Sequence, residues 1–112
     1  MRELVRGAIR LHILHHAAIE TVNGAWMAAE LARHGYAISP GTLYPTLHRM
    51  EAEGLLRSSR TVAGGRSRRE YVVTAKGRRA LEDGRRTLRE LAREVLDEAP
   101  QVDRSTRRSR NR

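Results

Sequence analysis

The 112-residue chain contains no cysteine, which excludes disulfide bridges, thiolate metal sites and cysteine nucleophiles. Long apolar runs are missing too: the longest extends only from Ala25 to Ala29, far short of the roughly 18 residues that a membrane-spanning helix needs. The first residues also lack the apolar stretch of a signal peptide. We therefore expect a soluble, cytoplasmic protein with no membrane partner.

Sequence motifs of catalysis are absent as well. The chain contains neither G-x-S-x-G nor the phosphate-binding G-x-x-x-x-G-K-[ST], and it places no paired acids on an apolar helix face. With 39% hydrophobic residues, a chain of this length can build one modest core. The sequence favours a small protein that is not an enzyme and has no cofactor. It leaves open whether an unidentified effector binds.

Positive charge is present in excess and is concentrated in two short segments. The chain has 22 basic and 13 acidic residues, for a net charge of +9. Residues 57–70 and residues 101–112 each carry five arginines and one acid, so these two segments hold most of the excess. A polyanion-binding protein concentrates charge where the partner's backbone passes, whereas a merely solvated surface spreads it. Nucleic acid is therefore the leading candidate partner, and we expect the protein to associate with the nucleoid.

Apolar residues at three- and four-residue spacing predict three helices in the first half of the chain. The first extends from Arg2 to about Ile19, the second from Ala25 to Arg33, and the third from Pro40 to about Glu53. Before the third helix, Ser39 offers an N-cap hydroxyl and Pro40 suits the first helical position.

The second half predicts a hairpin and a last helix. The β-rich runs Leu55–Val62 and Arg69–Thr74 flank a Gly-Gly turn, which indicates two paired strands. Thr74 can cap a helix from Ala75 to Ala99 that carries an apolar stripe, and Pro100 stops it.

Three helices followed by a hairpin is the order of a winged helix-turn-helix. We therefore expect a mainly α fold with a small β-hairpin and a C-terminal dimerisation helix. The expected parts are a DNA-binding domain over residues 1–74, the dimerisation helix over 75–99, and a basic tail over 100–112. The tail contains one apolar side chain, so we expect it to be disordered.

A more specific signal lies around the third predicted helix. Residues 39–55 read SPGTLYPTLHRMEAEGL and resemble the recognition-helix signature of the PadR family of bacterial transcriptional regulators, with the GTLYP core matching residue for residue. Thr74-Ala75-Lys76-Gly77 also matches the Thr-x-x-Gly with which the family begins its last helix. The resemblance covers about residues 4–99. It implies a short-form, homodimeric winged-helix protein, usually a repressor, that binds double-stranded DNA at an inverted-repeat operator.

The resemblance and the basic hairpin together predict the DNA-binding residues. Hydroxyl groups near the start of the third helix lie where backbone amides favour phosphate, and the hairpin arginines are expected to follow the DNA backbone. Arg49 has two open roles, a DNA contact or an ion pair with Glu53 four residues later. The predicted DNA-binding residues are Ser39, Thr42, Tyr44, Thr46, Arg49, Arg60, Arg66, Arg68 and Arg69.

The last predicted helix is longer than a small core can cover, which favours a homodimer. Its apolar side chains are the predicted interface, and the resemblance implies that the first helix contributes to it. The predicted interface residues are Leu4, Leu11, Leu81, Leu88, Leu91, Val95 and Leu96.

Two further alternatives stay open. His12 and His16 are four residues apart on one helix and could supply two ligands to a divalent metal ion or sense pH, but two partly buried, hydrogen-bonded imidazoles are the simpler interpretation, and we assign no metal site. A nonspecific DNA- or RNA-binding accessory or coat protein would also explain the basic segments. Competition with random DNA separates that class from a sequence-specific regulator.

Overall fold

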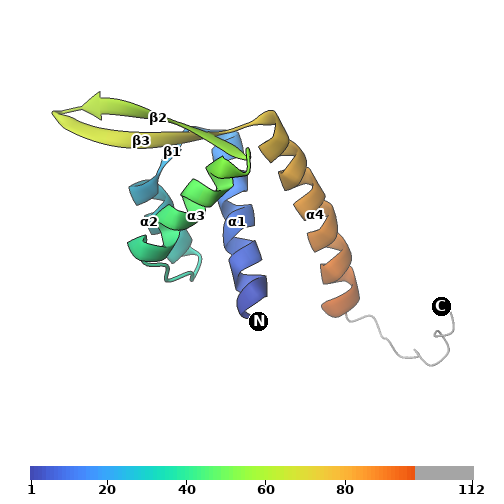
Figure 1. Cartoon of the computed structure of the whole chain (residues 1–112). Helices are drawn as coiled ribbons and strands as arrows, with labels where there is room; N and C mark the ends of the chain where they lie inside the picture. Colours follow the sequence, from blue (N-terminus) through green and yellow to red (C-terminus); the bar gives the residue numbers. More distant parts are fainter. Residues whose placement is uncertain (98–112) are drawn as a thin grey trace, which may run out of the picture. The chain divides into compact units, whose positions relative to one another are not determined.

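The computed structural model describes residues 1–97, in which four helices and a small three-stranded sheet form (Figure 1). The helices are α1 (Arg2–Ile19), α2 (Gly24–Arg33), α3 (Pro40–Ala52) and α4 (Ala75–Val95). The strands are β1 (Val22–Asn23), β2 (Leu56–Ala63) and β3 (Arg66–Val73). The expected mainly α fold with a β-hairpin is confirmed.

The chain divides into two compact units. The first extends from Met1 to Glu82, past the predicted domain boundary at residue 74, because the first turns of α4 bury Gly77 and Leu81. The second begins at Asp83 and contains the rest of α4.

Helix α4 ends at Val95 and not at Ala99 as predicted. An exposed helix end gains no packing from further turns, and Leu91, Val95 and Leu96 are all exposed. Residues 98–112, with the predicted stop at Pro100 and the predicted disordered tail, lie outside the described residues.

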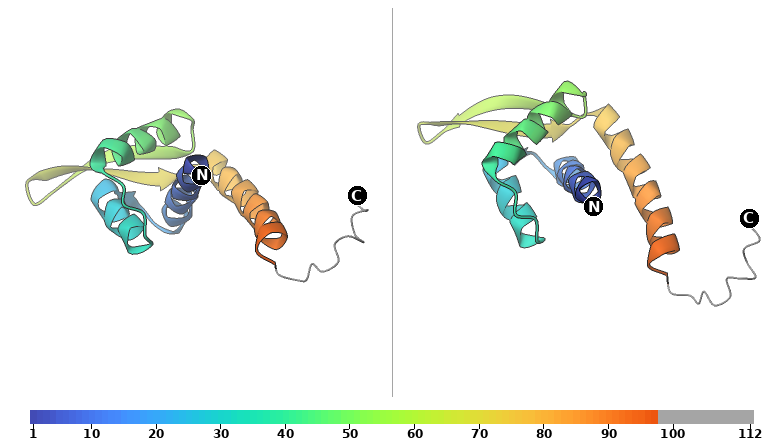
Figure 2. Two further views of the ribbon diagram at one scale, coloured as in Figure 1. Left: turned by 90° about the horizontal axis from the view of Figure 1, so that it is seen from below. Right: turned by 60° about the horizontal axis from the view of Figure 1, so that its bottom comes forward.

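The sheet is antiparallel, with β3 between β1 and β2. Ala63 pairs with Arg66 across a two-residue turn in which Gly64 and Gly65 both have positive φ, as a tight hairpin turn of this kind requires. The hairpin of β2 and β3 extends beyond α2 and α3 (Figure 2). Strand β1 was not predicted, because Val22 and Asn23 read as a linker and become a strand only by pairing with β3.

The core of the first unit lies between the helices and one face of the sheet. Leu43, Leu47 and Met50 follow one side of α3 at helical spacing and are buried against Tyr71 and Leu56 of the sheet. The opposite side of α3 takes no part in this core. Among the described residues, no helix combines the length and the apolar character that crossing a membrane demands.

A junction at Thr74 joins the end of α3, the base of the hairpin and the start of α4. The Thr74 hydroxyl accepts a hydrogen bond from the Gly77 amide at 2.9 Å, which confirms the predicted cap, and donates to the Gly54 carbonyl at 2.6 Å. The Thr74 amide donates to the Leu55 carbonyl at 3.1 Å. Gly77 packs so closely that a Cβ atom there would lie 2.2 Å from the Leu55 carbonyl oxygen.

We predict that Gly77→Ala lowers the free energy of unfolding by about 2 kcal/mol or more, because the added methyl group forces two backbone segments apart. Gly7→Ala is the matched control. Gly7 is also a helical glycine, but a Cβ atom there meets nothing within 4 Å, so that change is expected to stabilise the protein by about 0.5–1 kcal/mol. Urea denaturation measures both, and equal effects at the two positions would contradict the close approach at Gly77.

Candidate nucleic-acid interface

The outer side of α3 is exposed along its length. Its exposed residues are Gly41, Thr42, Tyr44, Pro45, His48 and Arg49. They alternate at helical spacing with the buried residues of the same helix, such as Leu43, Leu47 and Met50. Helix α3 therefore contributes one side to the core and presents the other to solvent. Polar side chains on an exposed helix of this kind can reach base edges and phosphates in a DNA groove.

Ser39 is the N-cap residue of α3, but the prediction that its hydroxyl caps the helix is wrong. The backbone carbonyl of Ser39 already accepts hydrogen bonds from the amides of Thr42 and Leu43, at 2.9 and 2.8 Å. The Thr42 amide is therefore engaged, and the Ser39 hydroxyl instead lies 3.4 Å from the Thr42 hydroxyl. Both hydroxyls are at the exposed start of the helix.

Tyr44 lies against the first residue of α2. A Cβ atom on Gly24 would come within 2.4–2.7 Å of the Tyr44 ring and hydroxyl, so only glycine permits this contact. The side chain of Tyr44 is still 42% exposed. It thus fixes the separation of α2 and α3 while keeping an accessible edge.

Thr46 and Arg49 have different roles from each other. Thr46 is 7% exposed and its hydroxyl donates to the Thr42 carbonyl at 2.8 Å, so we leave Thr46 out of the interface.

Glu53, the alternative partner of Arg49, instead pairs with Arg10 at 2.6 Å. The hydrogen bond from Arg10 holds the pKa of Glu53 below its ordinary value. Arg49 is exposed on the outer side of α3.

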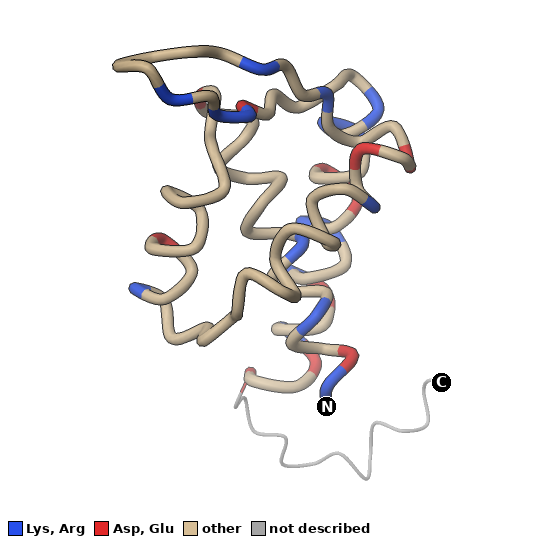
Figure 3. The backbone as a smooth tube through the Cα atoms, turned by 60° about the vertical axis from the view of Figure 1, so that its left-hand side comes forward, with Lys and Arg blue, Asp and Glu red and all other residues tan. Residues whose placement is uncertain are grey.

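The four predicted wing arginines lie on the two faces of the hairpin. Arg60 and Arg69 are directly opposite each other, on the face that carries Tyr71. Arg66 and Arg68 point to the other face, together with Arg57, which sequence analysis did not include. Figure 3 shows basic residues along the hairpin.

Glu51 ties the hairpin to α3. Its carboxylate accepts hydrogen bonds from the Ser58 amide at 3.1 Å and from the Ser58 hydroxyl, which lies 2.9 Å from both carboxylate oxygens. Arg69 donates to the same hydroxyl at 3.0 Å. Sequence analysis missed Glu51 and Ser58, because nothing in the local pattern links the end of a helix to the third residue of a strand.

The predicted dimer residues also divide into two groups. Leu81 is 4% exposed within the core of the first unit, and Leu11 is half-buried against that core. We therefore remove Leu81 from the proposed interface, since its side chain is already covered. The predicted interface residues that are exposed are Leu4, Leu88, Leu91, Val95 and Leu96.

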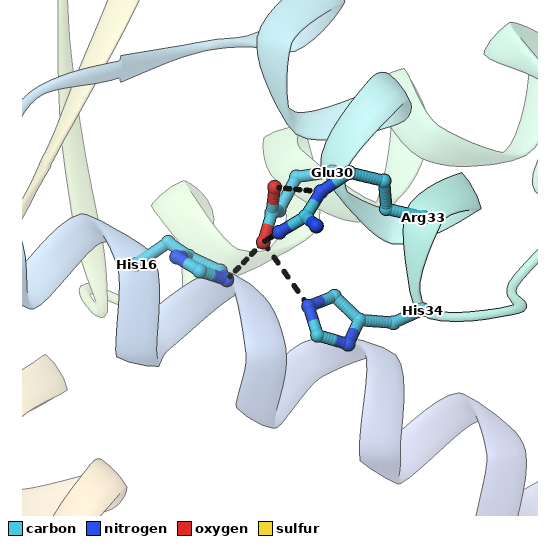
Figure 4. A network of polar contacts seen from close by, with 4 residues as sticks. All are labelled: His16, Glu30, Arg33 and His34. Carbon is cyan, nitrogen blue, oxygen red and sulfur yellow. Dashed lines mark hydrogen bonds and ion pairs between the residues drawn. The ribbon is translucent and has the colours of Figure 1, made fainter.

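The predicted His12 and His16 pair lies beside Glu30 of α2 and the C-cap residue His34, which were not predicted to join it. His16, Glu30 and His34 place one nitrogen or oxygen atom each within 4.8 Å of one another (Figure 4). Burial lowers the pKa values of His12 and His16, which favours their neutral forms. A hydrogen bond from Arg33 lowers the pKa of Glu30, which favours the carboxylate.

An exposed helix side beside a basic antiparallel hairpin, on this order of elements, defines a winged helix-turn-helix DNA-binding fold. The family model described as transcriptional regulator PadR-like family matches residues 13–83. The chain belongs to this family, whose members are DNA-binding transcriptional regulators and not enzymes.

Relatives with known sequences and structures agree with this assignment. The chain is 65% identical to transcriptional regulator Rv3488 of Mycobacterium tuberculosis over 96 residues, which cover 86% of this chain and 90% of the relative. A PadR family regulator from Eggerthella lenta has a similar structure, with a TM-score of 0.75, 33% identity and coverage of 83% and 82% of the two chains. For a PadR-like regulator of Bacillus cereus the TM-score is 0.76 and the identity 28%, with 84% and 93% covered.

We predict that Glu51→Gln destabilises the fold by about 1 kcal/mol, because it replaces charge-assisted hydrogen bonds to Ser58 with neutral ones. Glu70→Gln is the matched control: Glu70 is also a half-buried acid, lies in the hairpin and makes no hydrogen bond or ion pair through its side chain among the described residues. Denaturant unfolding measures both variants. A Glu51→Gln protein as stable as the control would show that Glu51 does not hold the hairpin.

Proposed function

We propose that the protein is a homodimeric repressor that binds an inverted-repeat operator and is released from it by an effector. Helix α3 of each subunit enters a major groove, and each hairpin lies along the neighbouring backbone. The two half-sites are then about one helical turn, roughly 10 base pairs, apart. The protein would act in the cytoplasm, at the nucleoid.

The observation that carries this proposal is the exposed side of α3 beside the arginines of the hairpin. Thr42, Tyr44 and Arg49 are accessible and are suited to contacts with bases or with nearby phosphates, and Ser39 lies at the start of the same helix. The hairpin supplies guanidinium groups for phosphate contacts from Arg60, Arg66, Arg68 and Arg69. Because Glu51 ties the hairpin to α3, both parts can meet one DNA duplex in a fixed register.

Dimerisation is supported by apolar side chains that the chain itself leaves uncovered. Leu88, Leu91 and Val95 follow α4 at intervals of three and four residues, and Leu88 is 52% exposed. This spacing of exposed apolar side chains is typical of a helix that packs against a second helix. A two-fold dimer in turn explains why the operator should be an inverted repeat.

We predict that helix and hairpin variants change DNA affinity in different ways. Thr42→Val should weaken specific binding by about 1–3 kcal/mol for each base-directed hydrogen bond that it removes and leave binding to random DNA nearly unchanged. Arg66→Ala should weaken binding to all sequences and reduce the salt slope of log K by about 0.9 for each phosphate left without its guanidinium partner, counted over both subunits. Fluorescence anisotropy with operator and random duplexes, at several salt concentrations, measures these effects.

Two controls match these variants. Thr46→Val removes a buried hydroxyl from the same helix, and Arg79→Ala removes an exposed arginine outside the hairpin. Neither should change the ratio of specific to random affinity. If Thr42→Val also leaves that ratio unchanged, α3 does not select sequence, and the nonspecific coat protein becomes the better explanation; an Arg66→Ala protein with the same salt slope as Arg79→Ala would remove the hairpin from the phosphate contacts.

For assembly, we predict that Leu88→Glu combined with Val95→Glu converts the dimer to monomers and abolishes tight operator binding, because four carboxylates would be buried in each dimer interface. Thr87→Glu places the same charge on an adjacent exposed position and should leave the dimer intact. Light scattering gives the mass of each form. A double variant that stays dimeric would remove α4 from the interface.

A further inference from the structure

We propose that His16, Glu30 and His34 form a binding site for one divalent transition-metal ion of the Zn²⁺ type. Two imidazole nitrogens and one carboxylate oxygen are a ligand set that Zn²⁺ accepts, with a water molecule completing four-coordination. Imidazole also suits Cu²⁺ and Ni²⁺, whereas Mg²⁺ and Ca²⁺ prefer sites made of oxygen atoms. The ligands come from α1, from α2 and from the C-cap residue of α2, so the ion would join these two helices.

The distances from Glu30 to the two imidazole nitrogens already match a metal site, and all three ligand atoms lie within 4.8 Å of one another. Glu30 Oε2 lies 3.4 Å from His16 Nε2 and 3.1 Å from His34 Nε2. In a tetrahedral site with bonds of about 2.0–2.1 Å, two ligand atoms are roughly 3.3 Å apart. An ion can therefore be accommodated with small movements of the two rings.

Neighbouring aromatic rings hold both imidazoles in place. The Trp26 ring meets the His16 ring edge-on, with 5.3 Å between their centroids. The His12 ring lies 5.0 Å from the His34 ring and 6.1 Å from that of His16. Rings fixed in this way lose little freedom when they bind an ion. The side chain of Glu30 is 11% exposed and that of His34 is 44% exposed, so solvent reaches the site from the His34 side.

Arg33 already binds the carboxylate of Glu30. Its guanidinium donates from Nε to Glu30 Oε1 and from an Nη atom to Oε2, both at 3.1 Å (Figure 4). A metal ion would take over Oε2, and the mostly exposed Arg33 side chain can withdraw from that oxygen. This competition separates a metal site from a purely structural network. Removing Arg33 should tighten metal binding, whereas it can only weaken a structural network.

The first experiment titrates the full chain, with no histidine tag and after chelator treatment, with Zn²⁺ in a calorimeter. We expect one ion per chain at micromolar or tighter affinity. Affinity should fall about tenfold or more in Glu30→Gln and in His34→Gln and should rise in Arg33→Ala. His48→Gln, which removes an exposed imidazole elsewhere, should bind as the unchanged protein does.

Two results would overturn the site. One is that the unchanged protein fails to bind Zn²⁺ at micromolar concentrations. The other is that Glu30→Gln and His34→Gln bind as tightly as the His48→Gln control. Circular dichroism of each variant verifies that it is folded, and the visible spectrum of the Co²⁺ form reports directly whether nitrogen ligands are removed in His34→Gln.

The position of the site also suggests an effector role, a step that rests on the proposed function. The ion would fix α2 against α1, and α2 leads through residues 35–39 into α3. We expect saturating Zn²⁺ to change operator affinity by about 5- to 150-fold in the unchanged protein and not in His34→Gln. Equal affinities with Zn²⁺ and with chelator would overturn the coupling. A chain that binds Zn²⁺ but no operator would contradict the proposed function and leave the site itself supported.

Discussion

The hydroxyl group of Thr74 is the contact that joins the end of α3, the base of the hairpin and the start of α4. It joins the carbonyl of Gly54, just past α3, to the amide of Gly77, in the first turn of α4. Both strands of the hairpin leave from this point, because β2 begins and β3 ends beside it. The close packing of Gly77 on the Leu55 backbone leaves little freedom there. The direction of the hairpin relative to α3 therefore follows from a few atoms in the core and not from the exposed arginines.

Local signals predicted most of the fold, and long-range pairing accounts for what they missed. Ser39-Pro40 and the Gly64-Gly65 turn act through their own backbone preferences, so the start of α3 and the hairpin were predictable. Strand β1 exists only because Val22 meets Tyr71, nearly fifty positions later. Pairings of this kind leave no periodic trace in a single sequence.

The elements that form the candidate interface were predicted more reliably than the role of each residue in them. Thr42 and Thr46 are the same residue type, one helical turn apart, yet one is exposed and the other donates to a carbonyl inside the helix. Leu81 belongs to the same heptad series as Leu88, but the core already covers it. Likewise, His16 was a candidate ligand from the sequence, whereas Glu30 joined it only once α2 was placed against α1. Burial and helix packing decide these cases, and neither can be read from spacing alone.

The pairing of Arg60 with Arg69 across the hairpin has a consequence for how the free and bound protein respond to salt. Like charges directly opposite each other in a ladder repel and so weaken it, and the hydrogen bonds from Arg60 to Ser67 and from Arg69 to Ser58 oppose that repulsion. Mobile ions screen that repulsion in the free protein, and in the complex that we propose a phosphate backbone would neutralise it. Higher salt should therefore stabilise the free hairpin through screening, while the same screening would weaken the contacts that we propose between these arginines and phosphate.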